Sequence, residues 1–253
     1  DGIFETLRAY DGIVFKINEH LERLFHSAKL INLKIPLTKY EIEKAVYSAI
    51  RKNKLNDAYI RVTISRGEGN LGYLSKCVPN VIIIAKKFIP YQKRMYEKGV
   101  SAATYNAERI LPEVKSTSCL PLVVAKLNTK DYFEAFLVDR DNNITEGIVS
   151  NIFFVKGNIL YTPKENILLG VTRGIIIKIA KQIGIQIKEA RIKKSEMYSF
   201  KECFLANTLV ELMPVVEIND RKICNGLPGP MTKRLIHEFK KERGLWLKKN
   251  SKK

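Results

Sequence analysis

The stretch Glu113-Val-Lys-Ser-Thr-Ser-Cys-Leu120 places Lys115 between Val114 and the pair Cys119-Leu120. These neighbours are compatible with partial burial of the lysine, and burial near other cations is what lowers the pKa of a catalytic lysine. One lysine in a chain with 44 lysine and arginine residues is nevertheless most often a surface charge. The stretch acquires meaning only together with motifs elsewhere in the chain.

The other motifs occur in a fixed order and cover nearly the whole chain. They are His20-Leu-Glu-Arg-Leu24, Glu146-Gly147, Gly170-Val-Thr-Arg-Gly174, Asn207-Thr208 and Gly229-Pro-Met-Thr232. Together with Lys115, this order resembles the class IV (fold type IV) pyridoxal-phosphate enzymes. That family includes branched-chain aminotransferases, D-amino acid aminotransferases and aminodeoxychorismate lyases.

The resemblance implies an α/β (α+β) fold of two domains with pyridoxal 5′-phosphate bound between them. Mixed strand and helix patterns in both halves of the sequence agree with such a fold. The expected domains are a smaller N-terminal α/β domain over 1–92 and a larger cofactor-binding domain over 93–253. The resemblance also implies a homodimer that acts on small amino acids and 2-oxo acids.

By resemblance, Lys115 is the catalytic residue and holds the cofactor as a Schiff base, and Glu146 pairs with the pyridine nitrogen. The expected phosphate ligands are Arg23, Val171, Thr172 and Thr208, and Leu168 is expected to lie against the ring. The expected substrate contacts are Tyr59, Arg61 and Leu209. A carboxylate beside the nitrogen keeps the ring protonated, which makes it an electron sink.

Each of these residues also has an ordinary structural interpretation. Glu146 precedes a glycine, as turn residues often do. Thr172 stands where a helix is expected to begin, and a helix start binds phosphate through free N–H groups but also takes threonine as an N-cap. Arg23 lies on a predicted helix, so it is either a bidentate phosphate ligand or a solvated arginine. Thr208 either donates to the phosphate or bonds locally, and Asn151 is expected to be structural.

The preferred substrate stays open on these residues. Tyr59 and Arg61 share one face of a predicted strand, so Arg61 either binds a substrate carboxylate, as in the branched-chain enzymes, or forms a cross-strand surface pair. Cys119 stands where those enzymes usually have a tyrosine, and Ile64-Ser-Arg-Gly67 is similar to the lyases. We expect transamination of branched-chain L-amino acids with 2-oxoglutarate. Aminodeoxychorismate lyase and D-amino acid aminotransferase are the alternatives.

The composition is that of an ordinary soluble globular protein. The 253 residues are 45% hydrophobic and 28% charged, with no apolar run long enough to span a bilayer and no signal peptide. We therefore expect a cytoplasmic protein with no membrane partner. The chain begins at Asp1 rather than methionine, so further residues are expected upstream. The four cysteines form no Cys-x-x-Cys pair, which disfavours a metal site.

The net charge of +18 raises the alternative of a basic nucleic-acid-binding protein with an inactive enzyme fold. The lysines are spread along the whole chain, and no basic stripe alternates with aromatic residues as a stacking platform requires. We therefore expect no nucleic-acid partner.

Local signals in the first half predict several elements. Phe4–Tyr10 and Ile13–Ile17 are predicted to form a hairpin, followed by a helix capped by Asn18. Thr38-Lys-Tyr-Glu41 is a capping box that predicts a second helix. Gly67-Glu-Gly-Asn-Leu-Gly72 fits the dinucleotide-binding fingerprint G-x-G-x-x-G, but no helical pattern follows it. A glycine-rich hairpin is predicted there instead.

Hydrophobic periodicity predicts a strand in the first half and helices in the second. Alternation with period two predicts a strand over 57–65, whose buried face carries Ala58, Ile60, Val62 and Ile64. Helical spacing predicts an amphipathic helix over Arg173–Ile183, ended by Gly184. A last helix is predicted with Pro230 in its first turn.

Overall fold

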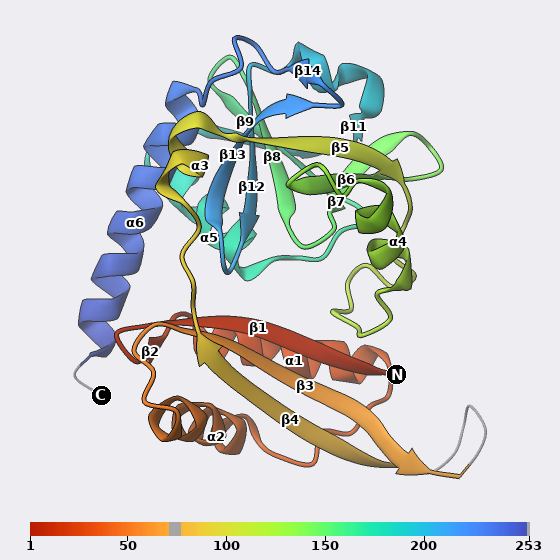
Figure 1. The fold of residues 1–253 in the computed structure, drawn as a ribbon, viewed down its shortest axis with the longest axis vertical. Coiled ribbons are helices and arrows are strands. Elements are labelled where there is room, and N and C mark those ends of the chain that lie inside the picture. The colour runs from red at the N-terminus through yellow and green to blue at the C-terminus, as the bar shows by residue number, and fades with distance from the viewer. Residues whose placement is uncertain (71–76, 252–253) are drawn as a thin grey trace. The chain divides into compact units, whose positions relative to one another are not determined.

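The computed structural model describes residues 1–70 and 77–251 (Figure 1). Contacts divide the chain into two compact units, and each is described by itself. The first unit comprises Asp1–Ile89, Glu113–Ser118 and Gly244–Lys253, and the second comprises Pro90–Pro112 and Cys119–Arg243. The predicted domains, 1–92 and 93–253, are continuous segments, whereas the first unit gathers three separate ones. The position of the domain boundary stays a prediction.

An antiparallel sheet forms the centre of the first unit. In the described residues its strand order is β2-β1-β3-β4, with bounds Ile13–Val14, Gly2–Tyr10, Ala58–Gly69 and Cys77–Lys87. The register pairs Glu5 with Val62 and Thr6 with Arg61. Side chains alternate along a strand, so Glu5 lies on one face of the sheet and Arg61 lies on the other.

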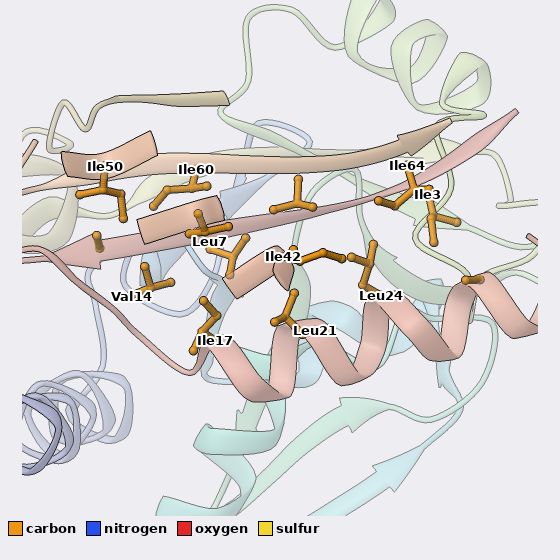
Figure 2. Packing of buried hydrophobic residues seen from close by; sticks show 14 of the residues in the cluster. Ile3, Leu7, Val14, Ile17, Leu21, Leu24, Ile42, Ile50, Ile60 and Ile64 are labelled. Carbon is orange, nitrogen blue, oxygen red and sulfur yellow. The ribbon is translucent and has the colours of Figure 1, made fainter. Parts of the chain in front are cut away.

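Helices α1 (Ile17–Leu30) and α2 (Lys39–Lys52) pack on one face of this sheet. Figure 2 shows the layer between sheet and helices, with the labelled residues Ile3, Leu7, Val14, Ile17, Leu21, Leu24, Ile42, Ile50, Ile60 and Ile64. Burying each such side chain contributes roughly 1.5–3 kcal/mol, so this layer holds the helices on the sheet. The predicted buried face of β3 is confirmed, because Ala58, Ile60, Val62 and Ile64 are all fully buried.

The two helices begin in different ways. The capping box of α2 is confirmed: Glu41 N–H donates to Thr38 Oγ1 at 3.2 Å, and Thr38 N–H donates to Glu41 Oε2 at 2.7 Å. The predicted cap of α1 is wrong, because its N-cap is Lys16 and not Asn18. Lys16 adopts a left-handed conformation (φ 56°) and pairs with Glu19 at 2.9 Å, so the helix starts before Asn18.

The first predicted hairpin of this unit is present, and the strands of the second pair with each other, although the turn between them lies outside the described residues. β1 and β2 pair across Asp11-Gly12, although β2 ends at Val14 because α1 begins soon after it. β3 and β4 pair as far as Gly69 and Cys77, and a strand, not a helix, starts at Cys77. The third glycine of the G-x-G-x-x-G match, Gly72, lies outside the described residues.

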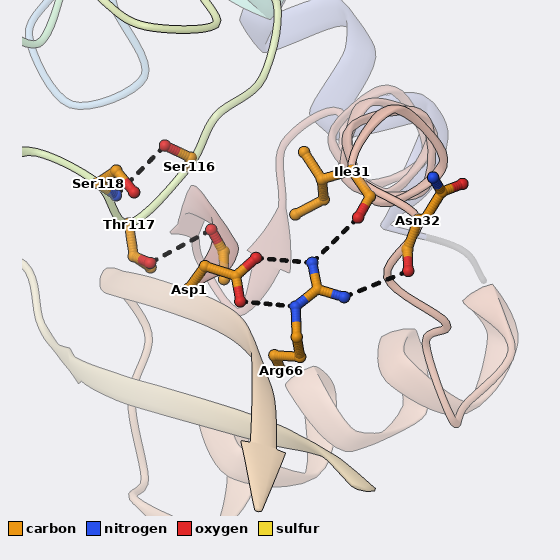
Figure 3. Close-up of polar contacts among 8 residues, drawn as sticks. Asp1, Ile31, Asn32, Arg66, Ser116, Thr117 and Ser118 are labelled. Atoms are coloured by element: carbon orange, nitrogen blue, oxygen red, sulfur yellow. Dashed lines mark hydrogen bonds and ion pairs between the residues drawn. The ribbon is translucent and has the colours of Figure 1, made fainter. Parts of the chain in front are cut away.

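Arg66 ties together three elements of the first unit (Figure 3). Its Nε and Nη2 atoms donate to the two carboxylate oxygens of Asp1 at 2.7 Å and 2.6 Å. The same guanidinium donates to the carbonyls of Ile31 at 3.0 Å and Asn32 at 3.3 Å, just past the end of α1. One half-buried arginine therefore fixes the start of β1 against β3 and α1.

A larger mixed sheet forms the second unit. Within the described residues its order is β10-β9-β8-β12-β13-β5-β6-β7-β11, with β14 beside β13. The pairs β13–β5, β5–β6 and β10–β9 are parallel, and the other pairs are antiparallel. The bounds are β5 Val100–Asn106, β6 Glu134–Val138, β7 Asn143–Gly147, β8 Asn151–Lys156, β9 Ile159–Pro163, β10 Gln186–Ala190, β11 Ile192–Lys193, β12 Glu202–Asn207, β13 Glu211–Ile218 and β14 Arg221–Lys222.

The remaining helices are α3 Lys93–Lys98, α4 Leu120–Asn128, α5 Val171–Gln182, the 3₁₀ helix η1 Lys194–Ser199 and α6 Pro230–Asn250. The predicted helix around Arg173 is confirmed as α5, and Gly184 follows it with a positive φ of 75°. Pro230 opens α6 as predicted. Among the described residues, no helix combines the length and the apolar character that crossing a bilayer requires.

The start of α6 is capped by a residue distant in sequence. Glu202 accepts the N–H groups of Met231 at 3.1 Å and Thr232 at 2.7 Å, so it satisfies two N–H groups that a helix start leaves unpaired. Gly229 makes room for this carboxylate, since a Cβ at that position would lie 2.0 Å from Glu202 Cδ. The Gly229-Pro-Met-Thr232 motif is therefore a helix start built around Glu202.

Candidate active site

The segment Glu113–Ser118 runs beside β1 and fixes the main chain of Lys115. Phe4 donates its N–H to the Lys115 carbonyl at 2.9 Å, and Thr117 donates its N–H to the Gly2 carbonyl at 2.9 Å. Figure 3 shows the side chain of Thr117 at the same carbonyl. Val114 is 1% exposed and belongs to the core of the first unit. Packing on one side and hydrogen bonds on the other therefore set the position of Lys115.

The side chains of Lys115 and Arg61 both lie over the aromatic ring of Phe4. The Nζ atom of Lys115 lies 4.7 Å from the ring centroid, and the Cζ atom of Arg61 lies 3.8 Å from it. Cations over aromatic faces gain roughly 0.5–2 kcal/mol, so the ring holds both positive groups. Tyr59 and Arg61 are half-buried on the same face of β3, and Arg61 Nε donates to Thr63 Oγ1 at 3.3 Å.

Arg23 takes part in a buried polar cluster with Glu5 and His20. Its Nε and Nη2 atoms donate to the Glu5 oxygens at 2.6 Å and 2.8 Å, and the His20 Nδ1 atom lies 2.8 Å from Glu5 Oε2. The side chains of Glu5 and Arg23 are 0% and 13% exposed, so Arg23 is not a solvated arginine.

The electrostatics of this cluster favour a charged Glu5 beside a neutral His20. Burial alone would raise the pKa of Glu5, but the charge and hydrogen bonds of Arg23, with those of His20, lower it to about 2. Burial lowers the pKa of His20, and the charges of Arg23 and Lys115 lower it further, against the opposing effect of Glu5. His20 is therefore neutral near pH 7, and its Nδ1–H donates to the Glu5 carboxylate.

Glu146 is buried in β7 of the second unit and is held from two sides. Leu168 donates its N–H to Oε2 at 3.0 Å, and Arg109 Nε lies 2.6 Å from Oε1. The side chain of Glu146 is 3% exposed and that of Arg109 is 11% exposed. An arginine stays protonated in proteins, so its neighbour is favoured as a carboxylate. Glu146 is therefore a buried, paired carboxylate and not a solvated turn residue.

The start of α5 has the properties of an anion site. Gly170 is its N-cap, no side chain caps it, and no acidic residue lies in its first turn. Thr172 is inside the helix and 6% exposed, so its interpretation as the N-cap is wrong. Asn151 donates to the Leu168 carbonyl at 2.8 Å, and a Cβ at position 170 would lie 2.1 Å from Asn151 Oδ1. These contacts tie Leu168 and the helix start to β8, and the first N–H groups of such a helix attract negative charge.

Thr208 and Leu209 lie in the turn between β12 and β13 and are half-buried. Asn207 Oδ1 accepts the N–H groups of Leu209 at 2.8 Å and Val210 at 2.9 Å, which fixes the turn locally. Ala206, just before the turn, pairs with Asn151 in β8. The turn therefore lies at the same end of the sheet as the start of α5.

The predicted residues form two sets, one in each unit. The first unit holds Arg23, Tyr59, Arg61 and Lys115, and the second holds Glu146, Leu168, Val171, Thr172, Thr208 and Leu209. In the first set, Phe4 links Lys115 with Arg61, and the charge of Lys115 acts on His20, which shares Glu5 with Arg23. In the second set, the Leu168 main chain links Glu146 with the start of α5.

Sequence reasoning missed the residues that support these sets. Glu5 carried a signal, because it alternates with Ile3 and Leu7 on the buried face of a strand, where a carboxylate needs a partner. His20 precedes Arg23 by one helical turn and is the matching partner. Arg109 carried no such signal, because it lies in an irregular segment without a hydrophobic period.

Comparison with known proteins identifies the family of this chain. Residues 2–218 match the amino-transferase class IV family. A relative from Methanocaldococcus jannaschii, assigned to the branched-chain-amino-acid aminotransferases, is 41% identical over 97% of this chain and 88% of its own. D-alanine aminotransferase of Listeria monocytogenes is 31% identical over 96% of this chain and 86% of its own.

A solved structure shows the same fold. The branched-chain amino acid aminotransferase of Escherichia coli has a TM-score of 0.89 and 31% identity, covering 95% of this chain and 84% of that one. The chain belongs to the class IV aminotransferase family, whose members are pyridoxal-phosphate enzymes. The expected family, fold class and enzyme class are confirmed.

Proposed function

We propose that this chain is a pyridoxal 5′-phosphate-dependent aminotransferase that exchanges the amino group of branched-chain L-amino acids with 2-oxoglutarate. The observation that carries this proposal is the pair of cations on Phe4: Lys115 supplies an amine, and Arg61 supplies a guanidinium for a carboxylate. The name of the Methanocaldococcus jannaschii relative supports the branched-chain substrate class.

The residues present fit the chemistry of the cofactor. Its phosphate needs cations and N–H donors, and the start of α5 has no acidic residue in its first turn and a buried Thr172. Its ring nitrogen needs a carboxylate, and Glu146 is one that Arg109 and Leu168 hold in place. Its aldehyde needs a primary amine, and Lys115 is one whose main chain is fixed on β1.

The proposed roles follow from these fits. Lys115 Nζ holds the cofactor and moves a proton at the substrate Cα, and Glu146 lies at the ring nitrogen. When bound, the cofactor supplies a protonated ring that accepts the electron pair released at Cα. The proposed phosphate ligands are Arg23, Val171, Thr172 and Thr208, with Leu168 against the ring. The proposed substrate contacts are Tyr59, Arg61 and Leu209.

Arg23, a proposed phosphate ligand, also pairs with Glu5. Its bidentate pair with Glu5 fixes the guanidinium plane, so the arginine is already oriented before an anion arrives. Glu5 is charged and fully buried, so the cluster of Arg23, His20 and Glu5 acts as a rigid support. This preorganisation reduces the entropy that phosphate binding costs.

A D-amino acid aminotransferase is the second candidate, favoured by the 31% identity to the Listeria monocytogenes D-alanine enzyme. We further propose the homodimer and the cytoplasmic location that the family resemblance implies. Light scattering during size-exclusion chromatography tests the oligomeric state, and a monomeric mass would contradict the dimer.

A substrate assay tests the proposed function. The purified protein with pyridoxal phosphate is given L-leucine or D-alanine together with 2-oxoglutarate, and the 2-oxo acid and the handedness of the glutamate are measured. We expect the 2-oxo acid of leucine and L-glutamate. Turnover of D-alanine alone would favour the second candidate. Pyruvate and 4-aminobenzoate from aminodeoxychorismate, without an amino acceptor, would indicate the lyase.

Two lysine variants complete the assay. Lys115→Ala is expected to abolish turnover, and Lys52→Ala, at an exposed position in the last turn of α2, is expected to leave it unchanged. Wild-type rates in Lys115→Ala would overturn the assignment.

A further inference from the structure

Arg109 contacts Glu146 and the chain that follows it. Its Nε atom lies 2.6 Å from Glu146 Oε1, and its Nη2 atom donates to the Ile148 carbonyl at 3.0 Å. One guanidinium therefore holds both the carboxylate and the turn after β7. The contact between Nε and Oε1 is an ion pair, so Arg109 acts on Glu146 mainly through its positive charge.

Other contacts also restrict the orientation of the Glu146 carboxylate. Leu168 N–H engages the second oxygen, Oε2, at 3.0 Å, so each carboxylate oxygen has a contact of its own. The turn behind it is fixed by Glu134, which accepts Ile148 N–H at 3.2 Å and the Ser150 hydroxyl at 2.7 Å. Gly147 packs against Glu134, since a Cβ there would lie 3.0 Å from the Glu134 carboxylate.

Burial makes the charge of Arg109 decisive for Glu146. A carboxylate that is 3% exposed has lost most of its hydration, which favours the neutral acid unless a counter-charge lies close. Arg109 is that counter-charge, at ion-pair distance from Oε1. A neutral Glu146 would no longer favour a proton on a neighbouring ring nitrogen, because the attraction between carboxylate and pyridinium would be lost.

We propose that Arg109 is a positioning residue that keeps Glu146 ionised and oriented, and thereby keeps the ring nitrogen of the cofactor protonated. This inference rests on the proposed function, and specifically on Glu146 as the partner of the ring nitrogen. Arg109 touches neither substrate nor cofactor in this proposal; it acts through Glu146.

The test uses the holoenzyme loaded with pyridoxal phosphate labelled with nitrogen-15 in the ring, whose chemical shift reports the proton on that atom. In the wild type we expect the shift of a protonated nitrogen near pH 7. In Arg109→Met we expect the shift of an unprotonated nitrogen. We also expect kcat/KM to fall by roughly 10- to 100-fold, a loss of the size that follows when a residue that holds a metal ligand in place is removed. A protonated nitrogen and unchanged kcat/KM in Arg109→Met would overturn the proposal.

Two further variants separate this role from a purely structural one. Glu146→Gln is expected to give the unprotonated shift by itself, and Arg109→Met added to it is expected to change kcat/KM by less than about twofold, since both act through one carboxylate. Losses of kcat/KM that multiply in the double variant would contradict the proposal.

Arg109→Lys keeps the charge and is expected to keep the proton on the ring, and loss of that proton would also contradict the proposal. If Arg109→Met fails to fold, Arg109→Gln, which also removes the charge, takes its place, and a protonated nitrogen with unchanged kcat/KM in that variant would overturn the proposal.

The control for losing an arginine–glutamate pair is Arg191→Met. Arg191 pairs with Glu165 at 2.6 Å in the same unit, and neither belongs to the proposed site. It is expected to leave the nitrogen shift and kcat/KM unchanged, and a change equal to that of Arg109→Met would overturn the specific role of Arg109. A wild type that binds no cofactor would refute the proposed function itself. A wild type that binds and turns over, with an unaffected Arg109→Met, refutes only the inference.

Discussion

The ammonium nitrogen of Lys115 lies 4.7 Å from the centroid of the Phe4 ring, on which the guanidinium of Arg61 also lies, at 3.8 Å. A catalytic lysine must be held without being neutralised, and an aromatic face holds a cation without supplying a carboxylate. Phe4 is thus the residue of β1 whose ring contacts both Lys115 and Arg61.

Phe4→Leu is expected to lower kcat/KM by roughly 2- to 10-fold, because it keeps apolar bulk and removes the aromatic face that both cations contact. Steady-state kinetics of the variant give this value. The control is Phe25→Leu, a half-buried phenylalanine of α1 that packs against the core of the first unit, and it is expected to leave kcat/KM unchanged. Equal losses in both variants would show that the effect comes from packing alone.

Arg61→Gln is expected to raise KM for the amino acid at least roughly 10-fold with a smaller change in kcat, because it removes a charged partner of the substrate carboxylate. The control, Arg51→Gln in the exposed last turn of α2, is expected to behave as the wild type. A KM for Arg61→Gln close to the wild-type value would contradict the substrate role and favour a structural pair within the sheet.

The sequence predicted some features of the first unit correctly and others incorrectly. Alternation over 58–64 and the Thr38 capping box were predicted correctly, because each depends on neighbours close in sequence. The cap of α1 was predicted at Asn18 but lies at Lys16, because a backbone conformation and an ion pair override side-chain preference.

The contacts around the proposed site residues could not be predicted from local sequence patterns. Glu5 accepts from Arg23, 18 residues away, and Arg109 pairs with Glu146 from a separate segment of the chain. Long-range partners of this kind depend on how the sheets bring distant segments together, and hydrophobic periodicity carries no information about them. The family resemblance supplied the roles of Lys115 and Glu146, whereas the contacts that hold them came only from the structure.

Glu5→Gln is expected to destabilise the protein by about 3–5 kcal/mol at pH 7, because it leaves Arg23 and His20 buried without their carboxylate. The folded-state pKa of Glu5 is about 2, below its ordinary value of 4.5, so its contribution is full above pH 4.5 and is lost as the pH falls towards 2. That contribution is on the order of 3 kcal/mol.

Urea unfolding at a series of pH values measures both effects. The wild type is expected to lose stability steeply between pH 4.5 and about 2, and Glu5→Gln is expected to show a flatter profile there. Glu22→Gln, at an exposed position of α1, is the control and should follow the wild type. Parallel profiles of the wild type and Glu5→Gln would show that Glu5 does not titrate with a lowered pKa.

Gly229→Ala is expected to destabilise the protein by about 1–3 kcal/mol, because the added Cβ would overlap the Glu202 carboxylate that caps α6. Gly244→Ala, in the interior of the same helix, has nothing within 4 Å of its added Cβ and is expected to stabilise by roughly 1 kcal/mol. Thermal unfolding of the two variants compares them directly. A neutral or stabilising Gly229→Ala would mean that Glu202 moves aside without cost.

Lys115 is the residue that we expect to hold the cofactor, and every other proposed role depends on it. Borohydride reduction of the pyridoxal-phosphate-loaded protein fixes the cofactor to the lysine that binds it, and mass spectrometry of the digested protein then locates the modified residue. We predict a phosphopyridoxyl group on the peptide that contains Lys115, absent from Lys115→Ala. A label on another lysine, or the same labelling in Lys115→Ala, would contradict this assignment.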